Sequence, residues 1–565
     1  MSQMEHEQLN TPADPDAWTP ADASWLYAVD KWGMGFYSVN EKGHVQVSPT
    51  RDPGRQIDLL DLVEKLERRD VHCPVIVRFG DILTQRVNDL AAAFAEARQA
   101  ANYRGEYRCI YPIKVNQQRH VVETICDAGR PHGFGLEAGS KAELLAVLGT
   151  VKDAGTPIVC NGFKDDDYLA AAMGAAAAGL DVTLVIEWLD GIDDAVRVAK
   201  KLGVQPRLGI RVRMRSNVTS RWEDSSGRHA KFGMTYPELD KALAMLRQAN
   251  MLDCLHFLHF HAGSQMSDLG GFGDAVAELA GLYCSLRKQG VPIDTLDVGG
   301  GLGIDYSGVA ANTDDSINYD LADYAHAVIS RIAEVCNNHA ELDHPVVLSE
   351  SGRALTAPHS VTLFNVLGAA NDRDKLATYF VNASVFQSLP DGWAIGQRFP
   401  IMPIHRLNEE PTHQGTLADI TCDSDGKVER FVTHQGAVSM LPLHKIRHND
   451  RYVLGAFLVG AYQEILGDLH NLFGDETIVH VSVGDDGEPV IDRVVRGDPI
   501  AEILTYVDYD PTHLAENFAD HIGKAAEQGR LSTAMAHAII DGYRACLNGS
   551  TYLRPPRPPA PGPRK

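Results

Sequence analysis

A repeat of short apolar runs and longer amphipathic stretches fills residues 105 to 350 and constrains the fold more than any other feature. Each apolar run has the length of a β-strand, and the stretches between the runs have helical spacing. The eight runs are 108–113, 133–136, 157–160, 182–186, 208–213, 254–260, 295–298 and 345–348. Eight βα units in succession predict a closed (β/α)8 TIM barrel, an α/β fold with a parallel sheet.

A doubly wound open sheet is the competing α/β architecture. It usually has fewer strands and carries its glycine-rich turn after the first strand. Here the glycine cluster GGGLG (299–303) follows the seventh run, so the sequence favours the barrel.

The rest of the chain has a different pattern of apolar and turn residues. TLADITCDSDGKVERFV and TIVHVSVGDDGEPVIDRVV predict hairpins in a mostly antiparallel β domain, and WGMGFYSVNEKGHVQVS (32–48) predicts a hairpin that turns at Asn40 to Gly43. Both chain ends are too polar or too proline-rich to build a core. We expect a disordered 1–24, a segment 25–74 that joins the β domain, a barrel 75–356, a β domain 357–510, helices 511–553 and a disordered 554–565.

Composition excludes several classes of protein. The 565 residues are 44% apolar and 22% charged, with a net charge of −23, which argues against nucleic acid or an anionic membrane as the main partner. No apolar run approaches the roughly eighteen residues of a membrane span, and the first residues do not resemble an export signal, so we expect a cytoplasmic protein. The nine cysteines are odd in number, scattered and never in CxxC pairs, which predicts reduced thiols.

Residues that could take part in catalysis or ligand binding follow the ends of the predicted strands. A barrel gathers the carboxyl ends of its strands on one face, and active sites lie there. We therefore expect one rim to hold Lys114 after the first run, Glu137 after the second, His261 after the sixth, Gly299 to Gly303 after the seventh, and Glu350 with Arg353 after the eighth.

Each of these features has an ordinary interpretation beside the functional one. Lys114 is suited to a Schiff base if burial lowers its amine pKa, although a solvated lysine at a strand end is more common. GGGLG offers unobstructed backbone N–H groups for a phosphate, or merely turns tightly. In SESGR, Glu350 and Arg353 suit a ring nitrogen and a phosphate, or form a surface ion pair.

Two further motifs are ambiguous in the same way. His259 and His261 in HFHAGS share a strand face that could bind a metal, but no third ligand has matching spacing, so ring stacking or a core hydrogen bond explains His261 better. TCDSDG (421–426) combines Cys422 with Asp423 and Asp425 in a turn. Inert cysteine and acidic turn residues are common, so this motif gains weight only from the others.

Taken together and in order, the motifs resemble those of the biosynthetic arginine decarboxylases, within the alanine-racemase-like (fold type III) pyridoxal-phosphate decarboxylases. The likeness runs from about residue 25 to 553. The motifs are YPIKVNQQ (111–118), GLEAGSKAEL (135–144), NGFKDDDY (161–168), KFG (231–233), HFHAGSQ (259–265), LDVGGGLGIDY (296–306), SESGRALTA (349–357), FQSLPDGW (386–393), LADITCDSDG (417–426) and VGAYQEILGDLHNLFG (459–474).

The resemblance implies an enzyme that converts L-arginine to agmatine and carbon dioxide, the first step of a route to putrescine and spermidine. Lys114 would bond to pyridoxal phosphate, Glu350 would hold the ring nitrogen protonated, and His261 would stack on the ring. Phosphate contacts would come from Gly300, Gly301, Leu302 and Gly303, with Ser264, Arg353 and Tyr462, and Gly352 would be a further cofactor-binding residue. Glu137 and Arg211 match further cofactor-binding positions with less defined roles.

The resemblance also implies a catalytic cysteine and a shared site. Cys422 would reach across a dimer interface and return a proton to the substrate carbon, so the protein would be at least a homodimer. The implied substrate-binding residues are Leu296, Asp297, Val298, Gly299, Gly300, Gly301, Leu302, Gly303, Ile304, Asp305 and Tyr306, with Asp423 and Asp425 as partners of the guanidinium and Glu464 behind them.

One departure from the family is plain, and several alternatives stay open. Family members often carry a long helical insertion after the barrel, whereas here only GAANDRDKLATYF (368–380) fills that place, which would limit assembly to a dimer. Magnesium is associated with the family, but the sequence offers no convincing ligand set for it. The alternative functions are decarboxylation of ornithine, lysine or diaminopimelate, or a regulatory role without catalysis.

Overall fold

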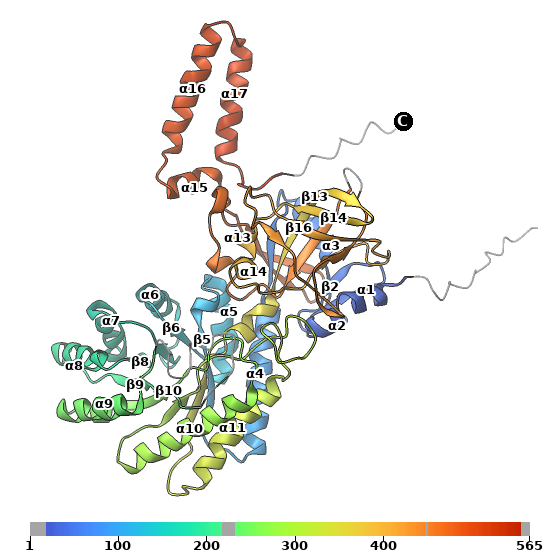
Figure 1. Ribbon diagram of the computed structural model, residues 1–565. Coiled ribbons are helices and arrows are strands. Elements are labelled where there is room, and N and C mark those ends of the chain that lie inside the picture. Colours follow the sequence, from blue (N-terminus) through green and yellow to red (C-terminus); the bar gives the residue numbers. More distant parts are fainter. Residues whose placement is uncertain (1–17, 217, 219–231, 447–449, 555–565) are drawn as a thin grey trace, which may run out of the picture.

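The computed structural model describes residues 18–216, 218, 232–446 and 450–554 (Figure 1). The chain ends predicted to be disordered therefore fall mostly outside the described residues. The prediction was wrong for residues 20 to 24, because helix α1 (Pro20–Leu26) begins there. Its start is stabilised by a capping box, in which Thr19 and Asp22 each bond the other's backbone N–H.

The barrel prediction is confirmed. Eight parallel strands close on themselves in chain order, because the last strand pairs with the first through Ser349 and Cys109. The strands are β5 (Tyr107–Pro112), β6 (Gly135–Ala138), β7 (Ile158–Cys160), β8 (Val182–Ile186), β9 (Arg207–Arg211), β10 (Leu255–His259), β11 (Thr295–Asp297) and β12 (Val346–Ser349).

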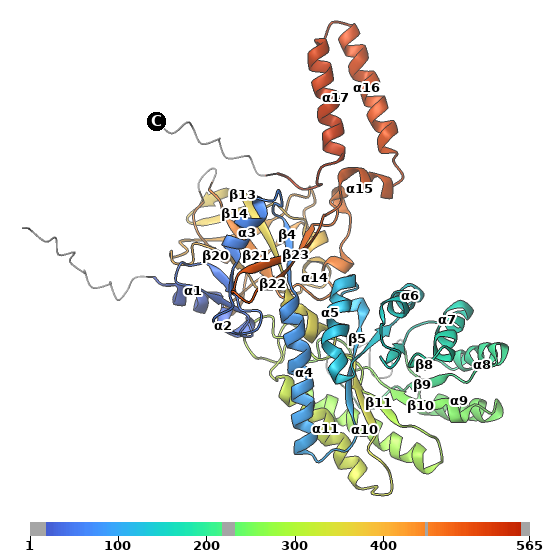
Figure 2. The same ribbon diagram turned by 180° about the vertical axis from the view of Figure 1, so that it is seen from behind.

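Helices wrap the barrel on its outside (Figures 1 and 2). They are α5 (Arg119–Gly129), α6 (Lys141–Thr150), α7 (Asp166–Ala177), α8 (Asp190–Leu202), α9 (Tyr236–Gln248), α10 (Leu269–Lys288) and α11 (Leu321–Asn337). Their sequences explain why they form: α8 buries Ile192, Ala195 and Val198 at helical spacing, and Asp320 caps α11.

Side chains fill the barrel in layers of different character. Because side chains alternate along a strand, every second residue points inward. The middle layer is an apolar cluster of Ile110, Val159, Val185, Phe257 and Leu348. Two residues beyond four of these five residues, the inward positions are occupied by polar groups, which form the floor of the candidate site: Asn161, Glu187, His259 and Glu350.

The second domain is a ten-stranded sheet, and the prediction of a mostly antiparallel β domain is confirmed. Its main path runs β17-β16-β14-β13-β4-β22-β23, with only β14–β16 and β4–β22 parallel. The strands are β4 (Val75–Phe79), β13 (Ser360–Arg373), β14 (Leu376–Val381), β15 (Ile401–Pro403), β16 (His413–Ala418), β17 (Lys427–Val428), β20 (Leu441–Leu443), β21 (Val453–Phe457), β22 (Thr477–Val483) and β23 (Pro489–Val495).

The predicted hairpins are present. β16 and β17 pair antiparallel around the DSDG turn, β22 and β23 around DDGE, and β1 (Tyr37–Val39) with β2 (Val45–Val47) after Asn40. The last pair forms a small sheet with β3 (Ile57–Asp58), which is followed by α3 (Leu59–Glu67). This sheet lies against the β domain, where Val45 N–H donates to the carbonyl of Ile404 at 2.9 Å.

One predicted domain boundary was wrong at residue 75. β4 was assigned to the barrel, but it lies in the middle of the ten-stranded sheet between β13 and β22. Only the following helix α4 (Gly80–Ala100) packs on the barrel, beside α11 and α5. A fully buried apolar run looks alike in either sheet, and its partners Thr362 and Val479 are hundreds of residues away.

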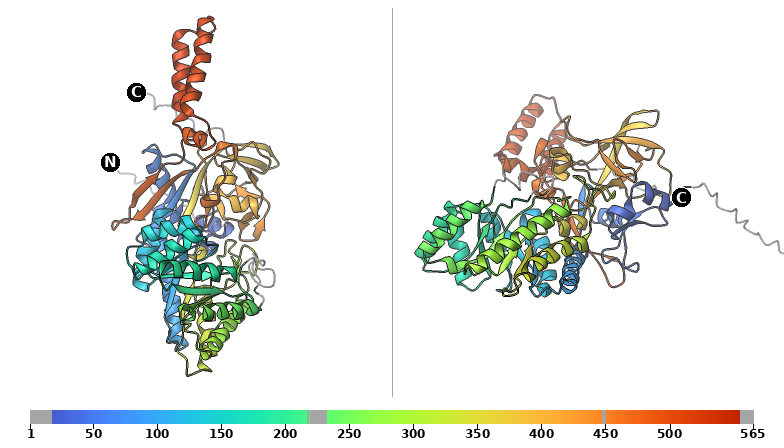
Figure 3. Two further views of the ribbon diagram at one scale, coloured as in Figure 1. Left: turned by 90° about the vertical axis from the view of Figure 1, so that its left-hand side faces the viewer. Right: turned by 60° about the horizontal axis from the view of Figure 1, so that its bottom comes forward.

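The boundary at residue 510 was also misplaced. The helical region begins with α15 (Ile500–Tyr506) and continues as the hairpin of α16 (Pro511–Glu527) and α17 (Thr533–Leu547), which projects from the body of the molecule (Figures 1 and 3). The short connection at 368–380 is confirmed, since β13 and β14 form a hairpin that turns at Asp374 and Lys375. Among the described residues, no helix is long and apolar enough to cross a bilayer.

The layered packing makes a prediction about stability. Leu296 of β11 is fully buried, so Leu296→Ala should lower the free energy of unfolding by about 2–5 kcal/mol. Leu145→Ala is the matched control, because Leu145 on α6 is 59% exposed and its removal should change that free energy by about 0.5 kcal/mol or less. Denaturant unfolding followed by circular dichroism measures both, and equal losses would contradict the packing described here.

Candidate functional site

Lys114 lies where β5 ends, within a short 3₁₀ turn (Ile113–Val115) at the carboxyl face of the barrel. Protein surrounds it on nearly all sides, yet its side chain stays accessible because it stands in the open mouth of the barrel. Two hydrogen bonds fix the turn: Tyr462 N–H donates to the carbonyl of Val115 at 2.8 Å, and Asn116 Nδ2 donates to the carbonyl of Gly460 at 3.1 Å.

The charge environment of Lys114 differs from the one expected. Desolvation alone would lower the amine pKa, as the sequence suggested. The nearby carboxylate of Glu137 raises the pKa above its ordinary value and outweighs burial, with Tyr462 and Glu350 acting in the same direction and Arg211 against it. Without a partner molecule, Lys114 is therefore a charged ammonium.

Glu137 is fully buried on β6, and neither of its carboxylate oxygens has a hydrogen-bond partner among the described residues. Burial raises its pKa above the usual range, and Lys114 pulls it back. Leaving a buried carboxyl unsatisfied costs about 1–3 kcal/mol or more, so such a group indicates a missing ligand.

Glu350 follows β12 and is also buried. Its Oε1 accepts a hydrogen bond from Asn161 Nδ2 at 2.7 Å. Burial and the neighbouring Asp297 raise its pKa, whereas His259 and Lys114 oppose that change. Glu350 and Glu137 thus place two carboxyl groups near the amine of Lys114.

The two histidines of HFHAGS have separate surroundings. His261 Nδ1 accepts the Gly300 N–H at 3.1 Å, and burial holds the His261 pKa well below its ordinary value, so the ring is neutral. His259 instead lies with Asp297 and Glu350. The structure therefore does not support a metal site made of these two histidines together.

The glycine loop after β11 brings backbone close to other backbone. A Cβ at Gly299 (φ +67°) would lie 2.3 Å from the Phe260 carbonyl oxygen, and one at Gly301 (φ +118°) would lie 2.7 Å from that of Gly263. Fewer N–H groups of this loop are free than the sequence predicted, because Gly300 donates to His261 and Gly303 donates to the Tyr319 hydroxyl. In the described part of the chain, the Gly301 and Leu302 N–H groups donate to nothing.

Arg353 lies beside this loop and is buried. Its Nη1 donates to the Tyr306 hydroxyl at 3.0 Å and its Nη2 to Ser264 Oγ at 3.2 Å, while no described group accepts from its Nε. The guanidinium lies 4.7 Å from the centre of the Tyr462 ring. Tyr462 itself has a φ of +71°, a strained backbone conformation that turns its side chain toward this region.

The remaining members of the predicted set are more varied. Arg211 on β9 forms an ion pair with Glu187 at 3.3 Å. Of the predicted substrate-contacting residues, Leu296, Asp297 and Val298 are fully buried. A ligand in the mouth would therefore meet this segment mainly through the backbone after Gly299.

Cys422, Asp423 and Asp425 lie in the β16–β17 turn of the second domain, and Cys422 is exposed. Cys422 N–H donates to Asn471 Oδ1 at 2.8 Å, and Asp423 lies 3.3 Å from His470 Nε2. None of these contacts involves the barrel mouth of the same chain.

Glu464 was expected as a further acidic partner of the guanidinium, behind Asp423 and Asp425. In the structure it contacts other side chains of the same chain. It forms an ion pair with the buried Arg78 and accepts from Asn116 Nδ2 at 3.0 Å. Both contacts are made by Oε1, which stabilises the domain junction next to the Lys114 turn.

Sequence reasoning missed several residues near the site. Asn161 and Glu187 follow β7 and β8, so their places after apolar runs could have indicated them. Asp391 in LPDGW is 9% exposed, accepts from Gln463 Nε2 at 2.9 Å, and interacts electrostatically with Arg353. The last contact joins segments far apart in the chain and has no local pattern.

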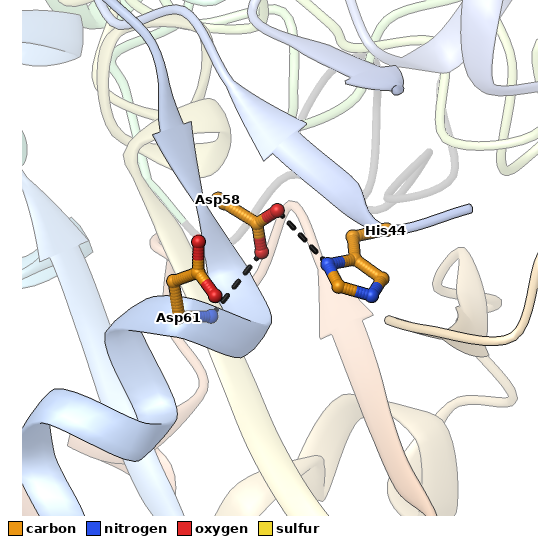
Figure 4. A group of neighbouring side chains, drawn as sticks. All are labelled: His44, Asp58 and Asp61. Atoms are coloured by element: carbon orange, nitrogen blue, oxygen red, sulfur yellow. Dashed lines mark hydrogen bonds and ion pairs between the residues drawn. The ribbon is translucent and has the colours of Figure 1, made fainter. Parts of the chain in front are cut away.

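A second group of potential metal ligands lies far from the barrel mouth, in the N-terminal segment. His44, Asp58 and Asp61 come close together (Figure 4). Asp58 is saturated with donors: Oδ1 accepts the N–H groups of Leu60 and Asp61 at the start of α3, and Oδ2 lies 2.9 Å from His44 Nδ1. This group is a helix cap rather than a cation site.

Comparison with known proteins agrees with this geometry. Residues 87–357 match the model of the pyridoxal-dependent decarboxylase family, pyridoxal binding domain, and residues 500–553 match an arginine decarboxylase C-terminal helical extension. A biosynthetic arginine decarboxylase of Prochlorococcus marinus is 38% identical, with 96% of this chain and 99% of the relative covered. The chain belongs to the family of biosynthetic arginine decarboxylases.

Other relatives extend the comparison. A biosynthetic arginine decarboxylase of Phocaeicola vulgatus is 38% identical over 95% of this chain and 99% of its own. The crystal structure of the biosynthetic arginine decarboxylase of Campylobacter jejuni superposes with a TM-score of 0.83 at 28% identity, covering 94% of this chain and 99% of that one. The family resemblance inferred from the motifs is confirmed.

The site of this arginine decarboxylase homologue fits pyridoxal phosphate. Groups without a hydrogen-bond partner among the described residues lie around it: both oxygens of the buried Glu137, Arg353 Nε, and the N–H groups of Gly301 and Leu302. An amine, an acid and a set of donors for a phosphate are what this coenzyme requires.

The close contact between Gly352 and the Lys114 turn generates a prediction. A Cβ at Gly352 would lie 2.4 Å from Val115 Cγ2, so Gly352→Ala should displace the turn and weaken binding of pyridoxal phosphate by about tenfold or more. Fluorescence titration with the coenzyme measures this change.

Gly281→Ala is the control for that measurement. Gly281 lies in α10 with open space around it, and alanine there should leave coenzyme affinity unchanged and stabilise the helix by about 0.5–1 kcal/mol. Coenzyme binding by Gly352→Ala with the affinity of the unaltered protein would contradict the assigned geometry.

Proposed function

We propose that this protein catalyses the decarboxylation of L-arginine to agmatine and carbon dioxide with pyridoxal phosphate as coenzyme. The carrying observation is the meeting of Lys114, Glu137 and Glu350 at the barrel mouth beside the free donors of the glycine loop. Membership of the biosynthetic arginine decarboxylase family supports the choice of substrate.

Each acidic or basic residue has a defined task in this proposal. The coenzyme, when bound, accepts the electrons that the departing carboxylate leaves on the substrate. Lys114 would supply the amine that attaches it, and the Glu137 carboxylate would accept and return protons at that amine. Glu350 would keep a proton on the ring nitrogen through its carboxylate.

The phosphate end would be held by the Gly301 and Leu302 N–H groups, Ser264 Oγ, the Arg353 guanidinium and the Tyr462 hydroxyl. Arg353 is fixed by Tyr306, so its donors are oriented before the ligand arrives. His261, neutral and held by Gly300, would lie against the ring face, and Arg211 would contact the ring from β9.

Proton return would come from a second subunit. Cys422 is exposed in one chain and contacts nothing in its own barrel mouth, which suits a homodimer in which this turn enters the partner's site. Two such interfaces related by two-fold symmetry would complete two sites. The short β13–β14 hairpin, in place of a long insertion, is consistent with assembly that stops at the dimer.

The guanidinium of the substrate requires an acidic partner. Asp423 and Asp425 would arrive with Cys422 from the neighbouring subunit. Asp391 of the same chain joins them as a candidate, because its Oδ2 is held by Gln463 and Oδ1 accepts no hydrogen bond among the described residues. A planar guanidinium can donate two parallel N–H groups to one carboxylate, which favours arginine over substrates that end in an ammonium group.

Magnesium receives no site in this proposal. The described residues contain two groups that could hold a metal, but Asp58 in the first is already saturated. The second contains Glu350, which in this proposal would serve the coenzyme.

A substrate panel tests the proposed reaction. Arginine should release carbon dioxide and agmatine faster than ornithine, lysine or diaminopimelate does, and Lys114→Ala should abolish both turnover and the visible absorption of the bound coenzyme. Faster turnover of ornithine would change the substrate assignment. Protein that binds the coenzyme but releases no carbon dioxide from any of these amino acids would indicate a regulatory homologue.

Mixing two variants tests the shared site. Cys422→Ala should bind the coenzyme but turn over slowly or return the proton to a wrong position, and Lys114→Ala should be inactive. When equal amounts are dissociated and reassociated, half of the dimers are mixed and each has one intact site, so about a quarter of the sites should recover. Absence of recovery, or unchanged activity of Cys422→Ala, would remove Cys422 from this role.

A further inference from the structure

The turn that carries Cys422 is fixed at its base by a buried carboxylate. Asp419 is 5% exposed, and its Oδ1 accepts the N–H of Thr421 at 2.8 Å. Its Oδ2 accepts the N–H of Val385, also at 2.8 Å. A Cβ at Gly426 would lie 2.2 Å from Asp419 Oδ1, so the returning chain passes directly over this carboxylate. The base of the turn is therefore held from both of its sides.

The tip of the turn is held from outside the hairpin. Cys422, Asp423 and Asp425 are all exposed, and within the turn the Asp425 N–H donates to Asp423 Oδ1 at 3.0 Å. The Cys422 N–H donates to Asn471 Oδ1 at 2.8 Å, and His470 Nε2 lies 3.3 Å from Asp423 Oδ2. Two consecutive residues of a distant loop thus contact two consecutive residues of the tip.

Asn471 has an unusual backbone conformation. Its φ of +54° and ψ of 23° lie in the left-handed region, inside the short 3₁₀ turn His470–Leu472. Asparagine adopts this conformation more readily than most other residues with a side chain. The Leu472 N–H donates to the Leu469 carbonyl at 2.7 Å and closes the turn. A left-handed residue of this kind persists where its surroundings hold it, and such residues cluster at functional sites.

The loop that carries Asn471 is itself fixed to the rest of the chain. The ring centres of His470 and Phe386 lie 4.6 Å apart. On the other side of Asn471, the Gly474 N–H donates to Thr551 Oγ1 at 3.1 Å, which ties the loop to the end of the C-terminal helical region. Asn471 therefore lies between two anchored points and can restrain an exposed turn.

We propose that Asn471 is a positioning residue for Cys422. Its side-chain oxygen holds the Cys422 N–H and thereby fixes the direction in which the thiol leaves the turn, while His470 supports the same arrangement through Asp423. Misplacement of a reacting group by about 1 Å can lower a rate by about a hundredfold, so an exposed thiol needs such a restraint. The inference rests on the proposed role of Cys422 in the partner's site.

Two substitutions separate the hydrogen bond of Asn471 from its backbone conformation. Asn471→Gly removes the acceptor but keeps the left-handed backbone accessible, so agmatine should form about tenfold or more slowly, while coenzyme affinity changes by about twofold or less. Asn471→Asp keeps an acceptor oxygen and should stay within about threefold of the unaltered rate. Equal losses in these two variants, or full activity of Asn471→Gly, would overturn the proposal.

Asn338→Ala is the matched control for these rates. Asn338 is also an exposed asparagine with one side-chain hydrogen bond to the backbone, because its Nδ2 donates to the Glu334 carbonyl at 3.1 Å. That bond lies at the end of α11 on the outside of the barrel. The Asn338 variant should therefore form agmatine at the unaltered rate.

Mixed dimers show in which subunit Asn471 acts. If it positions Cys422 of its own chain, reassociation of Asn471→Gly with Lys114→Ala gives one intact site in each mixed dimer, and about a quarter of the sites should recover. Reassociation of Asn471→Gly with Cys422→Ala leaves no intact site and should give no recovery. Recovery with Cys422→Ala would place the action of Asn471 in its own barrel mouth, and recovery with neither variant would indicate a general structural role. Either result would overturn the proposal.

Hydrogen exchange tests the contact without reference to activity. In the coenzyme-loaded protein, the Cys422 amide should exchange about fivefold or more faster in Asn471→Gly, because its acceptor is gone, and Asn471→Asp should keep the slow exchange. Unchanged exchange in Asn471→Gly would refute the proposal. Failure of Lys114→Ala and Cys422→Ala to restore activity together would refute the proposed role of Cys422 instead, while the exchange rates would still decide whether Asn471 holds this turn.

Discussion

The candidate site depends on one constraint: a layer of ionisable side chains lies directly on an apolar barrel core. Ile110, Val159 and Phe257 form the dry layer below, so charges above them are poorly solvated and act strongly on each other. This explains why the Glu137 carboxylate outweighs burial at Lys114. It also explains why carboxyl groups in this layer resist ionisation, since separation from water opposes each added negative charge.

The second domain contributes by holding the Lys114 turn in place. Buried Arg78 of β4 pairs with Glu464, and Glu464 accepts from Asn116 directly after that turn. Breaking a buried ion pair by removing one partner is strongly destabilising, so this junction resists sliding of one domain over the other. The geometry of the amine is thus determined by residues of the sheet as much as by the strand that carries it.

Much of the architecture could be predicted from the sequence because it follows local patterns. Apolar runs between amphipathic stretches predicted all eight barrel strands, and residues after those runs predicted Lys114, Glu137, Glu350 and Arg353 at one rim. Features decided by distant partners could not be predicted in this way: the sheet that takes in β4, the ion pair that occupies Glu464, and the carboxylate that reverses the expected pKa shift of Lys114. In each case, the deciding group lies elsewhere in the chain.

The placement of β4 has a consequence for how this molecule can be divided. The strand lies in the interior of the ten-stranded sheet, but the helix that continues it packs against the barrel. Removing the residues before the barrel takes β4, a central strand, out of the sheet. Cutting the chain between β4 and the barrel separates β4 from the later segments that complete the sheet. The ten-stranded sheet is built from segments on both sides of the barrel, so the sheet domain cannot be produced as one uninterrupted fragment with its own finished core.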